Sequence, residues 1–182
     1  MIAVRKGTNM DVRYINPFIA AVSAVFVTMV GAPVAIGTPY LKRPDESSDV
    51  VAFIGITGDI VGSVSFCLPT PTALRIARAF AQTEMPLDDP QFADALGEVV
   101  NMIAGQAKSR FEGRECHISL PRVLSGHEIA TLDSCRTPVL VLPCDTALGR
   151  FRLEITITAA RSTNSRNHSW TNECRISDLR YT

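Results

Sequence analysis

The sequence has no excess of charge of either sign, because 18 Lys and Arg residues balance 18 Asp and Glu residues among its 182 residues. Proteins that bind nucleic acid or anionic membrane surfaces usually carry a basic patch or a basic excess, which attracts phosphate groups. The balanced composition therefore gives no electrostatic support for either partner. A protein partner remains compatible with it.

The sequence also lacks a C-x-x-C pair, and its five cysteines are odd in number, which argues against a complete disulfide framework. We therefore interpret the cysteines as reduced thiols, which are typical of the cytosol. This predicts a cytoplasmic protein in which most cysteines are small buried hydrophobic residues. The three histidines show no zinc-ligand spacing relative to the cysteines, so we expect no metal site in this chain. The cysteines are Cys67, Cys116, Cys135, Cys144 and Cys174.

A long uninterrupted apolar run is absent as well. Residues 14–36 are apolar, but Asn16, Pro17, Gly31 and Pro33 interrupt them, which argues against a membrane span. Apolar residues recur there at helical spacing, which favours a helix that faces the core. Basic residues precede the stretch, so a signal peptide, and with it an envelope or secreted protein, stays open as an alternative.

The length of the chain suggests one domain with a core of useful size. We expect a loose leader over residues 1–10, a folded domain over 11–159 and a polar tail over 160–182. The tail is rich in Ser, Thr, Asn and Arg and has little apolar periodicity, which is typical of disorder.

The expected elements run in the order helix, strands, two helices, strands. This order lacks a steady strand–helix–strand alternation, so it favours an α+β fold with a largely antiparallel sheet. The expected helices cover about 12–30, 72–83 and 90–111, the last capped by Asp89 with Pro90 at its first position. The expected strands cover 34–41, 50–57, 60–68, 116–124 with a break at Pro121, 137–143 and 148–159. The turn signal Gly58-Asp59 predicts a hairpin of 50–57 with 60–68, and 137–143 with 148–159 is expected to form a second hairpin.

The helix expected over 90–111 has an unusual polar face. Asp94, Glu98, Asn101, Gly105 and Lys108 fall within an arc of roughly 80° at about 100° per residue, and the opposite side is apolar. Glycine inside a helix costs about 1 kcal/mol relative to alanine. At Gly105 the missing side chain would let another surface approach closely, one turn from Asn101. The simpler alternative is a solvated face with Glu98 and Asn101 as a surface pair.

The spacing Asp94-x-x-x-Glu98-x-x-Asn101 resembles the phosphatase motif of the CheC/CheX chemotaxis phosphatases. Asn101-Met-Ile-Ala-Gly105 is similar to the continuation of that motif. Further similarities lie in the first hairpin, in the opening helix and in Val123-Leu-Ser-Gly126 after the motif's proline. A single E-x-x-N favours the CheX-like branch, since CheC proteins typically carry two. Pro121 stands alone and slightly early, which predicts a shorter motif helix or exit turn.

The resemblance implies a CheC/CheX-like single domain, in which an N-terminal helix and a long central motif helix pack on the sheet. It implies a hydrolase of two-component signalling that removes the aspartyl phosphate of a CheY-like response-regulator receiver. Asn101 would position the attacking water, which suits an amide because it both donates and accepts hydrogen bonds. Glu98 would pair with the receiver's active-site lysine. Asp94, Gly105 and Lys108 would contact the partner.

The resemblance also implies Mg²⁺ in the receiver, no cofactor in this chain and a homodimer. The reaction needs a water placed in line and charge stabilisation on the transferred group, and the receiver would supply the charge. A non-catalytic CheX-like module that binds a receiver or another signalling partner remains an alternative.

Overall fold

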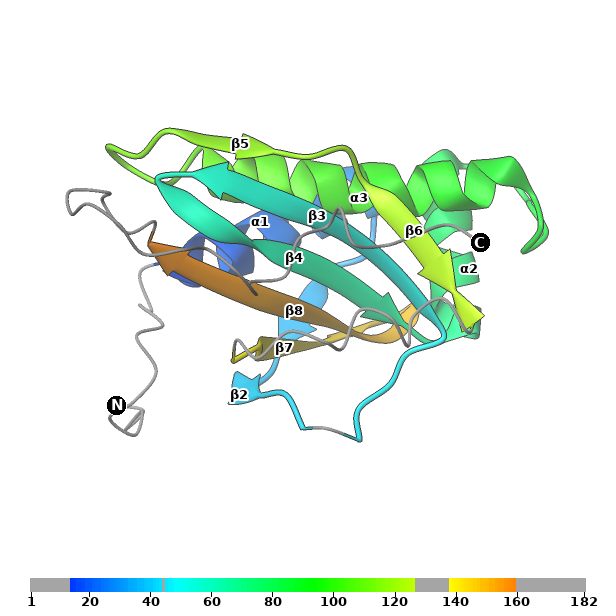
Figure 1. Cartoon of the computed structure of the whole chain (residues 1–182). Helices are drawn as coiled ribbons and strands as arrows, with labels where there is room; N and C mark the ends of the chain where they lie inside the picture. Colours follow the sequence, from blue (N-terminus) through cyan, green and yellow to red (C-terminus); the bar gives the residue numbers. More distant parts are fainter. Residues whose placement is uncertain (1–13, 44, 127–137, 160–182) are drawn as a thin grey trace, which may run out of the picture.

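The structure, a computed structural model, describes residues 14–43, 45–126 and 138–159. The expected leader and tail lie outside these residues. The described chain is an α+β fold in which one antiparallel sheet is covered on one face by helices α1, α2 and α3 (Figure 1). The fold class predicted from the sequence is therefore confirmed.

The helices begin and end at residues that explain their limits. The Asp89 side chain caps α3 by accepting a hydrogen bond from the Gln91 backbone N–H at 2.9 Å, and Pro90 follows at the first helical position. The N-terminal helix ends at Gly31, whose φ of 72° is left-handed, and its last turn is a π-helix. The helical elements are α1 (Asn16–Val25), the π-helix η2 (Phe26–Val30), α2 (Thr70–Ala81) and α3 (Pro90–Lys108).

The strands form a sheet in the order β1-β7-β8-β4-β3-β5, in which β2 also pairs with β7 and β6 with β3. Both expected hairpins are present, β3 with β4 and β7 with β8. The expected strand over 34–41 is instead two short strands on β7. The strands are β1 (Val34–Ile36), β2 (Tyr40–Leu41), β3 (Val50–Gly58), β4 (Ile60–Leu68), β5 (Cys116–Ile118), β6 (Arg122–Ser125), β7 (Leu140–Thr146) and β8 (Gly149–Ala159).

The core lies between the helices and the covered face of the sheet. Phe26 stacks on Phe151 with ring centroids 4.8 Å apart, and Phe66 meets Phe151 edge-on at 5.0 Å. Burial of each such large side chain contributes about 1.5–3 kcal/mol. α3 contributes one apolar face to this core, so its rotation about its own axis is fixed. The buried residues of α3 are Phe92, Ala95, Leu96, Gly97, Val99, Val100, Ile103, Ala104 and Ala107.

Candidate functional site

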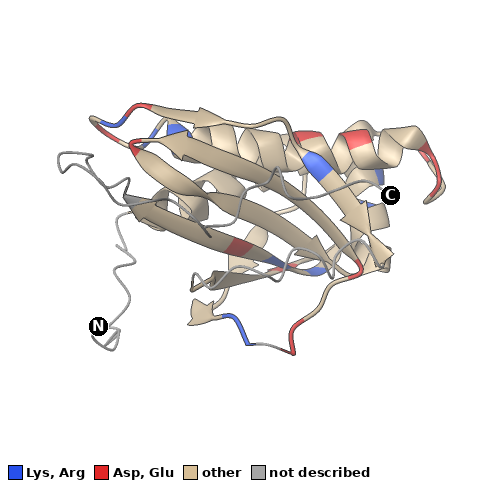
Figure 2. Ribbon diagram, in the orientation of Figure 1, with Lys and Arg blue, Asp and Glu red and all other residues tan. Residues whose placement is uncertain are grey.

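The polar face of α3 is directed away from the core, as the residue spacing predicts. Asp94 and Glu98 are exposed, and Asn101, Gly105 and Lys108 are half-buried. Figure 2 shows acidic residues on the outward side of this helix. The structure thus brings all five residues predicted for the site onto one helix face.

Glu98 and Asn101 contact each other directly. The Asn101 amide donates a hydrogen bond from Nδ2 to Oε2 of Glu98 at 3.3 Å. A long hydrogen bond that water can reach contributes little to stability, because water competes for both groups. A binding partner could therefore separate the two side chains at small cost and use the carboxylate and the amide independently.

Two glycines of α3 have different surroundings. A Cβ atom added at Gly97 would lie 3.5 Å from Cβ and Cγ of Pro121, whereas a Cβ added at Gly105 would have nothing within 4 Å. The open space at Gly105 agrees with the expectation that another surface could approach there. Sequence reasoning did not select Gly97, because its role depends on where Pro121 lies in space.

The connection between β5 and β6 follows α3 along the edge of the sheet (Figure 1). Pro121 lies in this connection, close enough to α3 that a side chain added at Gly97 would be in van der Waals contact with it. Pro121 interrupts the strand between Ile118 and Arg122, as the sequence predicted. The α3 helix ends at Lys108, three residues before the expected end.

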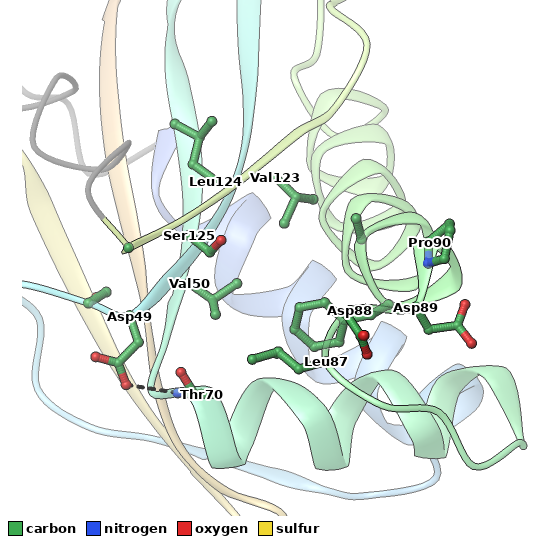
Figure 3. A pocket seen from close by; sticks show the side chains of 14 residues that line it. Asp49, Val50, Thr70, Leu87, Asp88, Asp89, Pro90, Val123, Leu124 and Ser125 are labelled. Atoms are coloured by element: carbon green, nitrogen blue, oxygen red, sulfur yellow. Dashed lines mark hydrogen bonds between the residues drawn. The ribbon is translucent and has the colours of Figure 1, made fainter.

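A cavity of about 750 Å³ lies at the N-terminal end of α3, between that helix, β6 and the start of α2 (Figure 3). Oδ2 of Asp49 accepts a hydrogen bond from the Thr70 backbone N–H at 2.9 Å at its edge. None of the five residues predicted for the site lines this cavity. They lie on a convex helix surface, whereas small-molecule sites are usually concave and mostly apolar. The geometry of the predicted site suits a macromolecular partner.

The buried cysteines do not suit nucleophilic chemistry. Burial raises the pKa of the Cys144 thiol to about 12 and also raises the pKa of Cys67. A thiol of this kind carries almost no thiolate near neutral pH, so neither residue is a reactive nucleophile. Cys116 is also buried and free, whereas Cys135 and Cys174 lie outside the described residues.

Within the residues that the structure describes, no group of three or more His, Cys, Asp and Glu side chains could hold a metal ion. No helix in residues 14–43, 45–126 and 138–159 is long and apolar enough to cross a membrane.

Comparisons with known proteins show which proteins are similar to this sequence, including its helix α3. The family model for the chemotaxis phosphatase CheX matches residues 50–145, which is more than half of the chain and includes all of α3. The CheY-P phosphatase CheX of Thermotoga maritima is 31% identical over 124 residues, which cover 66% of this chain and 80% of the relative.

Solved structures agree with the sequence comparison. The chemotaxis protein CheX of Desulfovibrio desulfuricans has a TM-score of 0.70 at 30% identity, over 80% of this chain and 99% of that one. A CheX–CheY–BeF3–Mg²⁺ complex from Borrelia burgdorferi matches with a TM-score of 0.70 at 27% identity, over 79% of this chain and 97% of that chain.

Proposed function

Because the chain belongs to the CheX family, we propose that it dephosphorylates a CheY-like receiver and that Asn101 and Glu98 carry this reaction. The observation that supports the residue assignment is the pairing of these two side chains on the polar face of α3. Both are accessible to a protein partner there, and neither lines the cavity at the end of the helix.

Asn101 acts as the water-positioning residue. Its carboxamide accepts a hydrogen bond from a water through Oδ1 and donates one through Nδ2, which fixes the direction of the water's lone pair. The water oxygen attacks the phosphorus while the bond from phosphorus to the receiver's aspartate oxygen breaks. Inorganic phosphate and a free carboxylate result. Positioning of this kind accelerates a reaction because the entropy of alignment has already been lost on binding.

Glu98 acts as the docking residue. Its carboxylate leaves the weak hydrogen bond to Asn101 and pairs with the lysine of the receiver's active site. The same movement frees Nδ2 of Asn101 for the water. Docking and activation are therefore coupled through one contact. Asp94, Gly105 and Lys108 form the rest of the surface that meets the partner.

The receiver holds the Mg²⁺ ion of the reaction, which offsets charge on the phosphoryl oxygens. The solved complex of CheX with CheY, BeF3 and Mg²⁺ from Borrelia burgdorferi supports a receiver as the partner. In our proposal this chain contributes no metal ligand. It works in the cytoplasm, where receivers signal, as a homodimer.

A phosphate-release assay tests the proposal. Receivers from the same organism are phosphorylated with a small phosphodonor, and phosphate release is followed with and without this protein. We expect faster release from at least one receiver, full inhibition by EDTA, and no effect of EDTA on this protein's melting curve. A non-catalytic module would instead bind the phosphorylated receiver and leave the rate of release unchanged.

A further inference from the structure

The edge strand beside α3 contains one extra residue. Ile118 pairs with Ile56, and Arg122 pairs with Phe53, so residues 119–121 face only residues 54–55 of β3. Three residues opposite two define a β-bulge. Bulges redirect a side chain that regular alternation would place on the other face of the sheet.

The bulge is held by hydrogen bonds on its sheet side. The Ser119 N–H donates to the Gly55 carbonyl at 2.9 Å, and the Gly55 N–H donates to Oγ of Ser119 at 3.0 Å. Ser119 Oγ–H donates in turn to the carbonyl of Leu120 at 2.9 Å. The serine side chain thus replaces the backbone acceptor that the bulge displaces. The backbone of Leu120 is fixed by this arrangement.

On its other side the bulge lies close to α3. A Cβ added at Gly97 would lie 3.5 Å from Pro121, and proline suits a bulge because it has no N–H that must find a partner. Leu120 therefore lies between two anchored residues, while its own side chain is 86% exposed. The other exposed large apolar side chains in the described part of the chain are 42–56% exposed. The bulge presents one leucine to solvent from a rigid backbone.

The backbone at Leu120 runs beside α3 (Figure 1). β6 lies near the N-terminal end of α3, where Val123 and Pro90 line one cavity, so the connection runs antiparallel to the helix. One strand residue advances about 3.3 Å and one helix residue about 1.5 Å. Leu120 precedes Pro121 by one residue. Its backbone is therefore displaced along α3 by the length of about two helix residues, from the level of Gly97 toward Asn101. This spacing predicts that the Leu120 backbone is level with the turn between Gly97 and Asn101.

We infer that Leu120 is an apolar anchor for the receiver that docks on the polar face of α3, where it fills an apolar depression beside the receiver's phosphorylation site. This inference rests on the proposed function. A fixed side chain loses little conformational entropy on binding, and a few buried anchors usually carry most of the binding energy. Glu98 sets the register of docking, and Leu120 supplies affinity.

The anchor predicts a separation of affinity from turnover. We expect Leu120→Ala to raise KM for the phosphorylated receiver about tenfold or more and to leave kcat within twofold of wild type. Leu120→Met should retain most of the affinity, since methionine keeps the apolar volume. Leu41→Ala is the matched control, because Leu41 is an exposed leucine on β2, which pairs with β7. Leu41→Ala should leave both constants unchanged.

A calorimetric titration with a beryllofluoride-activated receiver measures the same effect without hydrolysis. Unchanged affinity in a folded Leu120→Ala protein would overturn the inference, and so would an equal loss in Leu41→Ala. If wild-type protein binds the receiver but releases no phosphate, only the proposed hydrolysis fails, and the affinity of Leu120→Ala still decides the role of the anchor. If no receiver binds the wild-type protein, both proposals are wrong.

Discussion

Gly97 and Gly105 lie two turns apart on the same helix, yet one meets the chain's own edge strand and the other meets open space. A side chain at Gly97 would be in ordinary van der Waals contact with Pro121, and one at Gly105 would touch nothing. The two glycines therefore divide the outward side of α3 into two regions. The region at Gly97 is already occupied by the fold.

The difference between the two glycines indicates which part of α3 a partner can bind. A receiver cannot displace Pro121 from Gly97 without disturbing the bulge, but it can approach Gly105 with no obstruction. The accessible region includes Asp94 and Glu98 and continues through Asn101 to Lys108. Leu120 borders this region from the bulge. The contact surface is thus bounded by the chain's own connection on one side and is open on the other.

Asn101→Ala should give the largest effect in the open region. We expect a loss of about 100-fold or more in the rate of phosphate release, because removal of a positioning group in a reaction costs about that much. Its melting temperature should not fall, since the lost hydrogen bond is weak and alanine favours a helix. Single-turnover phosphate release and thermal melts measure both quantities. Wild-type turnover in the variant would show that water is positioned elsewhere.

Glu98→Ala should mainly weaken docking. The receiver lysine would remain desolvated without its partner, which costs about 2 kcal/mol or more, or roughly 30-fold in affinity. Glu84→Ala is the matched control, since Glu84 forms an exposed surface pair with Arg78. Titration with an activated receiver compares the two variants. Equal affinities for both variants would mean that Glu98 does not meet the receiver.

Gly105→Ala should separate the two regions in a binding experiment. A methyl group at Gly105 would stand in the path of the partner, and we expect affinity for the receiver to fall about fivefold, or about 1 kcal/mol. Gly97→Ala adds the same group where the fold already excludes the partner, so its affinity should equal that of wild type. A loss shared equally by both variants would contradict the division of the helix face.

The sequence predicted the parts of the fold that depend on local pattern. Asp89 and Pro90 marked the start of α3, Gly58 marked the first hairpin, and period-3.6 spacing separated the buried and polar faces of the motif helix. Family resemblance then assigned roles to Glu98 and Asn101. Those roles, unlike the positions of the residues, remain predictions.

The features that the sequence did not reveal depend on register between distant segments. The bulge at 119–121 exists only because two strands pair with β3 one residue out of step, and no local pattern encodes that offset. The closeness of Pro121 to a side chain at Gly97 also depends on where these distant segments lie. The division of residues 34–41 into two strands has the same kind of origin, because both pieces are defined by pairing with β7.

The smallest expected effect concerns the stability of the free protein. Gly97→Ala and Gly105→Ala should each stabilise it by up to about 1 kcal/mol, because alanine favours the helical backbone and neither methyl group meets an obstacle. This corresponds to a rise of about 2–4 °C in melting temperature for a chain of this size. Denaturant titrations of both variants and the wild type measure the change. A destabilised Gly97→Ala protein would mean that the new methyl group clashes with Pro121, because the two lie closer together than 3.5 Å. Comparable stabilisation in both variants, with affinity lost only in Gly105→Ala, would show that Gly105 is retained for binding and not for folding.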